Sequence, residues 1–116
     1  ADPRRAGSDG LSALLDWAAG HLDEDLSVGA LALRAAMSPR TFARHFTEAT
    51  GATPAAWVRD QRVRRAEELL ESGAGTVASV ARRCGLGSTD TLRRHLVRMR
   101  GVTPEQYRIT FGTPPS

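Results

Sequence analysis

RTFARHFTEATGATPAAW at residues 40–57 recurs later in the chain as DTLRRHLVRMRGVTPEQY at residues 90–107. The two stretches align without a gap at a constant offset of fifty residues. Identical or chemically similar residues occupy eight pairs of positions: Thr41 and Thr91, Phe42 and Leu92, Arg44 and Arg94, His45 and His95, Phe46 and Leu96, Gly51 and Gly101, Thr53 and Thr103, and Pro54 and Pro104. Just upstream the offset is forty-nine, because the second copy has one extra residue in its turn. The chain therefore contains two copies of one structural unit.

Each copy carries the start and stop signals of a helix. In the first copy, Ser-Pro at residues 38–39 and Thr-Pro at residues 53–54 place a capping side chain before a proline at the first helical position. Phe42 and Phe46, four residues apart, predict one buried face, and Gly51 predicts the end of this helix. A short helix precedes it across a tight turn, so each copy has the helix-turn-helix arrangement.

The same signals extend outward from the repeat. Apolar residues at helical spacing predict a helix at about residues 10–22, and the capping side chain of Ser27 predicts a short one after it. The helix that starts at Pro54 is the longest, and its two apolar groups, at residues 57–58 and 63–70, need not face the same neighbour. Strand patterns are missing, so we expect an all-α fold of about seven helices. We expect a linker or disordered edge at residues 1–9, a first helix-turn-helix subdomain at 10–53, a long linker helix at 54–72, a second helix-turn-helix subdomain at 73–111 and a tail at 112–116.

The second helix of a helix-turn-helix unit enters the major groove of DNA and needs polar side chains opposite its buried stripe. Arg40 and Arg44 lie one turn apart on such a face, from which guanidinium groups can make bidentate bonds to guanine. In the second copy an acid, Asp90, replaces the counterpart of Arg40, which predicts either weaker reading of sequence there or contact mainly with the DNA backbone. The predicted base contacts are Arg40, Arg44, Asp90, Arg93 and Arg94. The predicted contacts to the DNA backbone are Ser38, Thr41, Thr53, Thr89, Thr91, Arg98 and Thr103.

The long helix at residues 54–72 is expected to act as a strut between the two recognition helices. Successive major-groove segments lie about 34 Å apart on one face of a duplex. Because the two copies have different reading faces, the predicted target in double-stranded DNA is asymmetric. One monomer should suffice to occupy it.

The charge of the chain is unevenly placed. Its sixteen basic residues are all Arg, and the formal net charge is +3. Residues 1–33 hold two Arg and six acidic residues, whereas residues 34–116 hold fourteen Arg and seven acidic residues. The basic excess therefore coincides with the repeat, as a DNA-binding surface requires. Two explanations fit the absence of Lys, bidentate recognition by guanidinium and the codon bias of a GC-rich genome, and the genome explains it better.

Several classes of protein are disfavoured by composition. The single cysteine, Cys84, cannot form an internal disulfide, which favours a reducing cytoplasm. No apolar run is long enough to span a bilayer, and the opening residues do not show the basic, apolar and small-residue pattern of a signal peptide. Carboxylates, histidines and Cys84 form no clustered set of nucleophile, base or ligands, so we expect no enzyme, no metal site and no cofactor. The polar opening ADPRRAGSDG is typical of the edge of a longer protein.

Residues 10–111 resemble the C-terminal DNA-binding domain of the AraC/XylS family of bacterial transcription regulators. The resemblance rests on Gly85-Leu86, Leu92, Leu96, Gly101, Thr103-Pro104 and Tyr107-Arg108, with Leu at three positions where the family has Phe. The stretches SPRTFARHF and WVRDQRVRRAEELL are most similar to an actinobacterial subgroup that carries an amidotransferase-like N-terminal domain.

The resemblance implies two helix-turn-helix units on a linker helix, acting in transcription regulation. It also implies that the bases are contacted at the positions of Arg40, Arg44, Asp90, Arg93 and Arg94. A domain for dimerisation or regulation would then belong to a longer parent protein, and the isolated domain is expected to be monomeric.

Sequence-specific binding of double-stranded DNA is therefore the leading hypothesis. The alternative is a helical protein-interaction module whose basic face meets an acidic partner. The acidic residues 1–33 either cover the rear of the helix bundle or contact RNA polymerase. A cluster on the long helix has acids within one turn, which favours surface salt bridges over DNA contacts. This cluster consists of Arg59, Arg62, Arg64 and Arg65.

Overall fold

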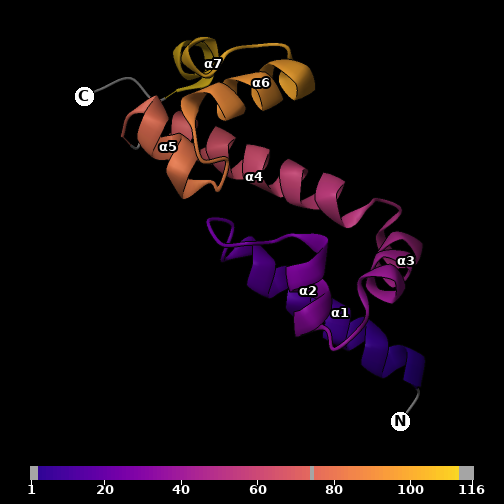
Figure 1. The fold of residues 1–116 in the computed structure, drawn as a ribbon. Helices are drawn as coiled ribbons and strands as arrows, with labels where there is room; N and C mark the ends of the chain where they lie inside the picture. The colour runs from indigo at the N-terminus through magenta and orange to yellow at the C-terminus, as the bar shows by residue number, and fades with distance from the viewer. Residues whose placement is uncertain (1–2, 74, 113–116) are drawn as a thin grey trace. The chain divides into compact units, whose positions relative to one another are not determined.

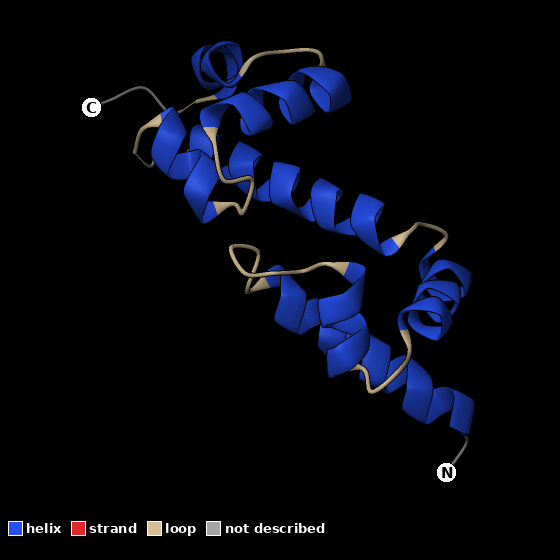
Figure 2. Ribbon diagram, in the orientation of Figure 1, coloured by secondary structure: helices blue, strands red, loops and turns tan. Residues whose placement is uncertain are grey.

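The computed structural model describes residues 3–73 and 75–112, with only the backbone for residues 3–9. Within these ranges the chain folds into seven helices and no strand (Figures 1 and 2). The helices are α1 (Pro3–Ala19), α2 (Val28–Arg34), α3 (Pro39–Thr50), α4 (Pro54–Glu71), α5 (Val77–Arg83), α6 (Thr89–Arg100) and α7 (Pro104–Phe111). The prediction of an all-α fold is confirmed.

Two compact units divide the chain, Ala1–Arg59 and Asp60–Ser116, and their boundary lies inside α4. Each unit contains one helix-turn-helix pair, α2 with α3 in the first and α5 with α6 in the second. The helix at residues 54–72 was expected to be a segment of its own. The corresponding helix, α4, begins in one unit and continues in the other.

The division of α4 follows from a change in its buried face. Val58 packs in the first core, whereas Val63 packs in the second. Since an α-helix has 3.6 residues per turn, the step from one to the other rotates the side chain by about 140°. The two apolar groups of this helix therefore serve different cores, in agreement with the interpretation of the sequence.

The first core forms around two phenylalanines of α3. Phe42 and Phe46 are buried with ring centroids 5.8 Å apart, and Trp57 of α4 packs edge-on against Phe46 at 5.9 Å. The other buried residues of this core are Ala18, Leu22, Leu26, Leu31, Ala32 and Val58. α3 thus turns one face inward and leaves the opposite face to solvent.

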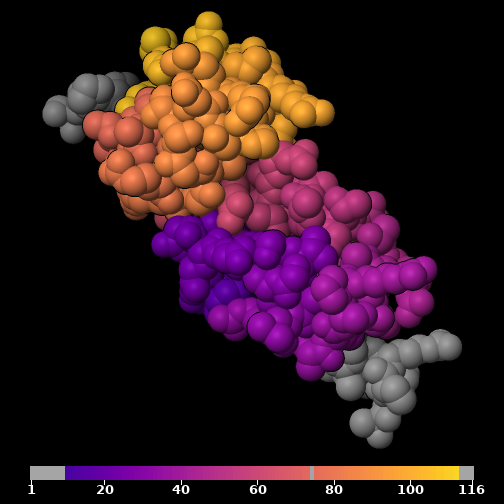
Figure 3. Space-filling model, in the orientation of Figure 1, coloured from indigo at the N-terminus to yellow at the C-terminus, as the bar shows by residue number. Residues whose placement is uncertain are grey.

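Leu92 and Leu96 of α6 take the corresponding places in the second core. They are buried together with Val63, Ala66, Leu69, Leu70, Val80, Ala81, Cys84 and Tyr107. In the space-filling view, the orange side chains of α5 and α6 cover the face of this unit that is turned towards the viewer (Figure 3). With Leu in place of Phe the core remains apolar. The side chains on the opposite face of α6, such as Arg94 and Arg98, are exposed to solvent.

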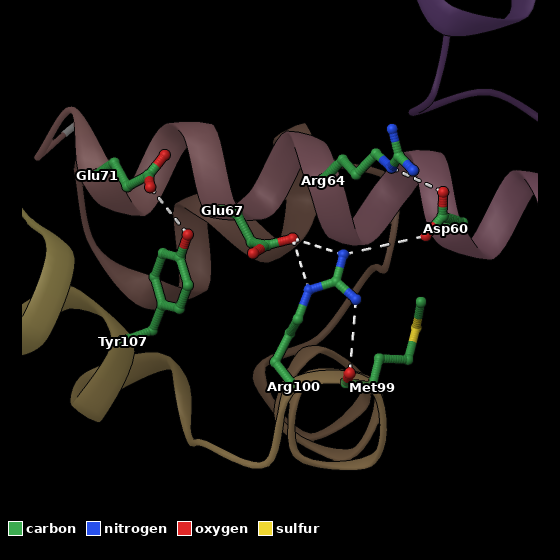
Figure 4. A network of polar contacts seen from close by, with 7 residues as sticks. All are labelled: Asp60, Arg64, Glu67, Glu71, Met99, Arg100 and Tyr107. Atoms are coloured by element: carbon green, nitrogen blue, oxygen red, sulfur yellow. Dashed lines mark hydrogen bonds and ion pairs between the residues drawn. The ribbon is translucent and has the colours of Figure 1, made fainter.

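A polar network joins α6 and α7 to α4 within the second unit (Figure 4). Arg100 donates from Nε to Glu67 at 3.1 Å, and its guanidinium also forms an ion pair with Asp60 at 4.0 Å. The hydroxyl of Tyr107 donates to Glu71 at 2.9 Å. Burial and this hydrogen bond raise the pKa of Tyr107 above its ordinary value. These contacts fix the orientation of α6 within its unit.

The first helix differs from its predicted bounds at both ends. α1 begins at Pro3 and not at about residue 10, so most of the expected linker edge is helical, although residues 1–2 lie outside the described part of the chain. Apolar periodicity marks only the buried part of a helix, which explains the late predicted start. The helix ends at Ala19 because the amide of His21 donates to Ala18 at 3.0 Å, in a tighter turn than an α-helix makes. Leu22, predicted to lie inside the helix, is buried all the same.

At one matching position in the turns of the two helix-turn-helix units, both residues have a positive φ but only one of them is a glycine. Ala36 has a φ of 56°, and Gly85, its counterpart in the repeat, has a φ of 91°. A positive φ brings the Cβ of an L residue too close to the backbone, at a cost of roughly 1–2 kcal/mol, whereas glycine adopts it freely. The first turn therefore holds an alanine in a conformation that favours glycine.

Ala36→Gly is expected to raise the free energy of unfolding of the first unit by about 0.5 kcal/mol. The free energy gained by relieving backbone strain in the folded state exceeds the free energy lost because glycine gives the unfolded chain more conformational entropy. Urea denaturation followed by circular dichroism measures the change. Ala49→Gly is the matched control, because Ala49 is exposed in α3, where glycine lowers stability by up to about 1 kcal/mol. Equal losses in the two variants would show that Ala36 is not strained.

Candidate nucleic-acid interface

Ser38 and Thr41 form the cap of α3. The hydroxyl oxygen of Ser38 accepts a hydrogen bond from the backbone amide of Thr41 at 3.2 Å and donates to the Thr41 hydroxyl at 3.0 Å. Ser38, predicted to contact the DNA backbone, therefore has its hydroxyl hydrogen engaged inside the cap. The Thr41 hydroxyl accepts this bond and keeps its own hydrogen, which can be donated to a phosphate oxygen.

α6 begins with the same cap. Ser88 accepts from the backbone amide of Thr91 at 3.2 Å and donates to the Thr91 hydroxyl at 3.0 Å. Ser88 is absent from the predicted contacts, although the offset of fifty residues pairs it with Ser38. Thr89, which is among them, is the first residue of α6 and is half-buried. The two candidate recognition helices therefore start with the same capping hydrogen bonds.

The outer face of α3 carries two exposed arginines. Arg40 and Arg44 lie one turn apart, on the side away from Phe42 and Phe46. Within residues 3–73 and 75–112, neither guanidinium forms an ion pair with a carboxylate. Their donors are thus available to an acceptor from outside the chain, such as a guanine edge or a phosphate.

The outer face of α6 carries mixed charge. Arg94 and Arg98 are exposed and, among the described residues, form no ion pair with a carboxylate. Asp90 is also exposed and places a negative charge in the first turn of the helix. Arg93 lies 3.6 Å from Glu105 in the first turn of α7, measured from guanidinium nitrogen to carboxylate oxygen. The second face is therefore less positive than its number of arginines suggests.

Thr53 and Thr103 cap the helices that follow the recognition helices. The Thr53 hydroxyl accepts from the amide of Ala56 at 3.2 Å, and the Thr103 hydroxyl accepts from the amide of Gln106 at 3.1 Å. In the second unit the side chain of Gln106 also accepts from the backbone amide of Thr103 at 2.8 Å. Both hydroxyl groups retain a hydrogen for an external acceptor, but the Thr103 amide is already bonded within the chain.

Two of the four arginines in the cluster on α4 form ion pairs on the surface, as the sequence predicts. Arg64 lies 2.7 Å from Asp60, and Arg65 lies 2.9 Å from Glu68. Arg100 of α6 is bound to Glu67, and this hydrogen bond raises the pKa of the Arg100 guanidinium. These guanidinium groups are expected to contribute less to the binding of an external anion than the arginines of α3, because each already interacts with a carboxylate of the chain.

The described residues also bear on catalysis, metal binding and membrane insertion. Cys84 is buried, and burial raises the pKa of its thiol, so the group stays neutral and is a poor nucleophile. In the part of the chain that the structure describes, no three side chains of His, Cys, Asp or Glu gather as a metal site would require. None of the helices described combines the length and the apolar character needed to cross a bilayer.

Comparisons with known proteins agree with this geometry. The helix-turn-helix domain family matches residues 31–109. The HTH-type transcriptional regulator Rv1931c of Mycobacterium tuberculosis is 44% identical over 85 residues, which cover 73% of this chain and 33% of that protein. The regulatory protein PocR of Salmonella typhimurium is 33% identical over 99 residues, which cover 83% of this chain and 33% of that protein. The chain thus spans about a third of the length of these curated relatives.

A solved structure is similar over most of the chain. It is the crystal structure of the DNA-binding domain of AdpA, described as the global transcriptional factor, in complex with a target DNA. Its sequence is 44% identical, the TM-score is 0.83, and the match covers 87% of this chain and 91% of that one.

Proposed function

Because the chain belongs to the helix-turn-helix domain family of AraC-type transcription regulators, we propose that it binds double-stranded DNA sequence-specifically and so acts in transcription control. The observation that carries the proposal is the outer face of α3, where Arg40 and Arg44 are exposed, one turn apart and not engaged with any carboxylate of the described residues. A similar domain, that of AdpA, was crystallised with a target DNA.

In this proposal α3 is the principal reading helix. Arg40 and Arg44 donate in pairs to the O6 and N7 acceptors of guanine in the major groove, and each such pair discriminates by about 1–3 kcal/mol. Arg94 and Arg93 of α6 approach a second groove segment, and Asp90 excludes phosphate there or accepts from cytosine N4. Contacts to the DNA backbone come from Ser38, Thr41, Thr53, Thr89, Thr91, Arg98 and Thr103.

The two units are proposed to contribute unequally. The first reading face has two cations without a carboxylate partner, whereas the second has an acid at Asp90 and an ion pair at Arg93. A target read by two different faces of one chain is asymmetric, and a monomer of this domain can occupy it.

The parent regulator is proposed to be a bacterial activator that acts in the cytoplasm, on the nucleoid. Its dimerisation or regulation would depend on a further domain, for which the amidotransferase-like type is our proposal, and RNA polymerase is a candidate partner. We propose that this domain binds DNA and catalyses no reaction.

Binding to double-stranded DNA selected from a random pool tests the proposed function. The domain is expected to select an asymmetric site. Its observed association constant is expected to fall with salt, by a slope in log–log coordinates of about −0.9 for each phosphate contacted. Fluorescence anisotropy between low and physiological salt measures this slope. A short palindromic site would contradict the tandem geometry, and an association constant that did not change with salt would contradict phosphate contact.

A further inference from the structure

The first turn of the helix that follows the recognition helix differs between the two units. In the first unit α4 begins with Pro54, Ala55 and Ala56, and in the second unit α7 begins with Pro104, Glu105 and Gln106. Both turns follow a capping threonine at equivalent positions of the repeat. Two methyl side chains in one unit are thus replaced by two hydrogen-bond acceptors in the other.

The acceptor Glu105 is directed at the reading face of α6. Its carboxylate lies 3.6 Å from the guanidinium of Arg93, and the two side chains are 50% and 52% exposed. The positions that match this pair in the first unit are Ala55 and Ala43, neither of which is ionisable. The first unit therefore cannot form this ion pair.

The acceptor Gln106 engages a second group at the same end of α7. Its amide oxygen accepts from the backbone amide of Thr103 at 2.8 Å. The matching residue, Ala56, has no side-chain acceptor for the amide of Thr53. Two groups of the second unit that could donate to DNA thus already interact with side chains of α7, Arg93 through an ion pair and the Thr103 amide through a hydrogen bond.

We infer that Glu105 competes with DNA for Arg93 and so weakens the contribution of the second unit to binding. The inference rests on the proposed function of α6 as a DNA-reading helix. For Arg93 to reach a phosphate or a base edge, its guanidinium must leave the carboxylate of Glu105. That carboxylate then remains beside the polyanion, where like charges repel.

The exposure of the pair sets the size of this effect. An exposed ion pair contributes roughly 0–1 kcal/mol, so DNA can displace Glu105 from Arg93. The contact therefore attenuates binding and does not block it. This attenuation adds to that of Asp90, and the first unit, with alanines at the positions of Arg93 and Glu105, has no equivalent of it.

A double-mutant cycle on the whole chain tests the inference. The four proteins are the wild type, Glu105→Gln, Arg93→Ala and the double variant, each titrated into the selected double-stranded DNA at fixed salt. Glu105→Gln is expected to raise the affinity for DNA about three- to five-fold when Arg93 is present, because the guanidinium of Arg93 then no longer has to leave a carboxylate before it binds DNA. In the R93A background the same change is expected to raise the affinity by less than about 1.5-fold. There it removes only the screened repulsion between the carboxylate of Glu105 and the DNA phosphates.

Glu68→Gln is the matched control for charge. It removes one acid from an exposed ion pair of the same unit, that with Arg65 at 2.9 Å, and Arg65 is not among the proposed DNA contacts. Its affinity is expected to stay within about 1.5-fold of the wild type. An equal gain from Glu105→Gln in both backgrounds, or no gain in either, overturns the inference. If the wild type itself did not select DNA, the proposed function would fail instead, and the two failures are therefore distinguishable.

Discussion

Phe46→Ala is expected to lower the free energy of unfolding of the first unit by about 3–5 kcal/mol, the usual cost of truncating a buried aromatic side chain. Phe46 is 0% exposed, and the rings of Phe42 and Trp57 pack on it at 5.8 and 5.9 Å. Its removal leaves a cavity between α3 and the beginning of α4. Small domains are stable by only about 5–15 kcal/mol, so the loss is a large share of the total.

Urea denaturation followed by circular dichroism measures the loss, and hydrogen exchange of the α2 and α3 amides locates it. Leu33→Ala is the control, since Leu33 lies in the same unit but is 82% exposed, and its truncation should change stability by no more than about 0.5 kcal/mol. Similar losses in the two variants would mean that Phe46 is not the centre of this core.

Arg44→Ala is expected to weaken binding of the selected DNA by about 1–3 kcal/mol and to relax the preference at one guanine. Arg44 is exposed on α3, and no carboxylate of the described residues holds it, so removing it breaks no internal ion pair that would complicate the result. Anisotropy titrations against the selected site and against variants with each guanine replaced measure both changes.

Two further variants define what Arg44 contributes. Arg44→Lys keeps the positive charge but lacks the planar fork, so it is expected to retain salt-dependent binding and lose the preference for guanine. Arg65→Ala removes the same charge from an ion pair on α4 and is expected to change the affinity less than about two-fold. If Arg44→Lys kept the full preference for guanine, Arg44 would be a phosphate contact and not a base contact.

The helical framework could be predicted from the sequence because its signals are local. A serine or threonine before a proline begins a helix, a glycine ends it, and residues four apart share a face. Ser38, Gly51 and the pair Phe42 and Phe46 therefore predict α3 closely. The start of α1 was missed for the same reason, since residues that carry no apolar period leave no such signal.

The candidate site was predictable in part. The exposure of Arg40, Arg44 and Arg94 follows from their position opposite the buried stripe, which is a property of helical periodicity alone. The cap at Ser88 could have been found by applying the offset of the repeat to Ser38. That these residues contact DNA stays a prediction, which the substitutions above test.

The duplication, most of the helix bounds and the buried face of each helix follow from the amino-acid sequence alone. The bounds and the buried faces can be predicted because they depend on residues within one or two turns of each other. Ion pairs between different helices, by contrast, follow from the packing of the folded chain. Arg93 is paired with Glu105 across two helices, and Arg100 is held by Glu67, thirty-three positions away. Ion pairs form between groups that packing brings within a few ångströms, and the separation of two residues along the chain does not give that distance. The two reading faces, similar as sequences, therefore differ in the charge that they can offer to DNA.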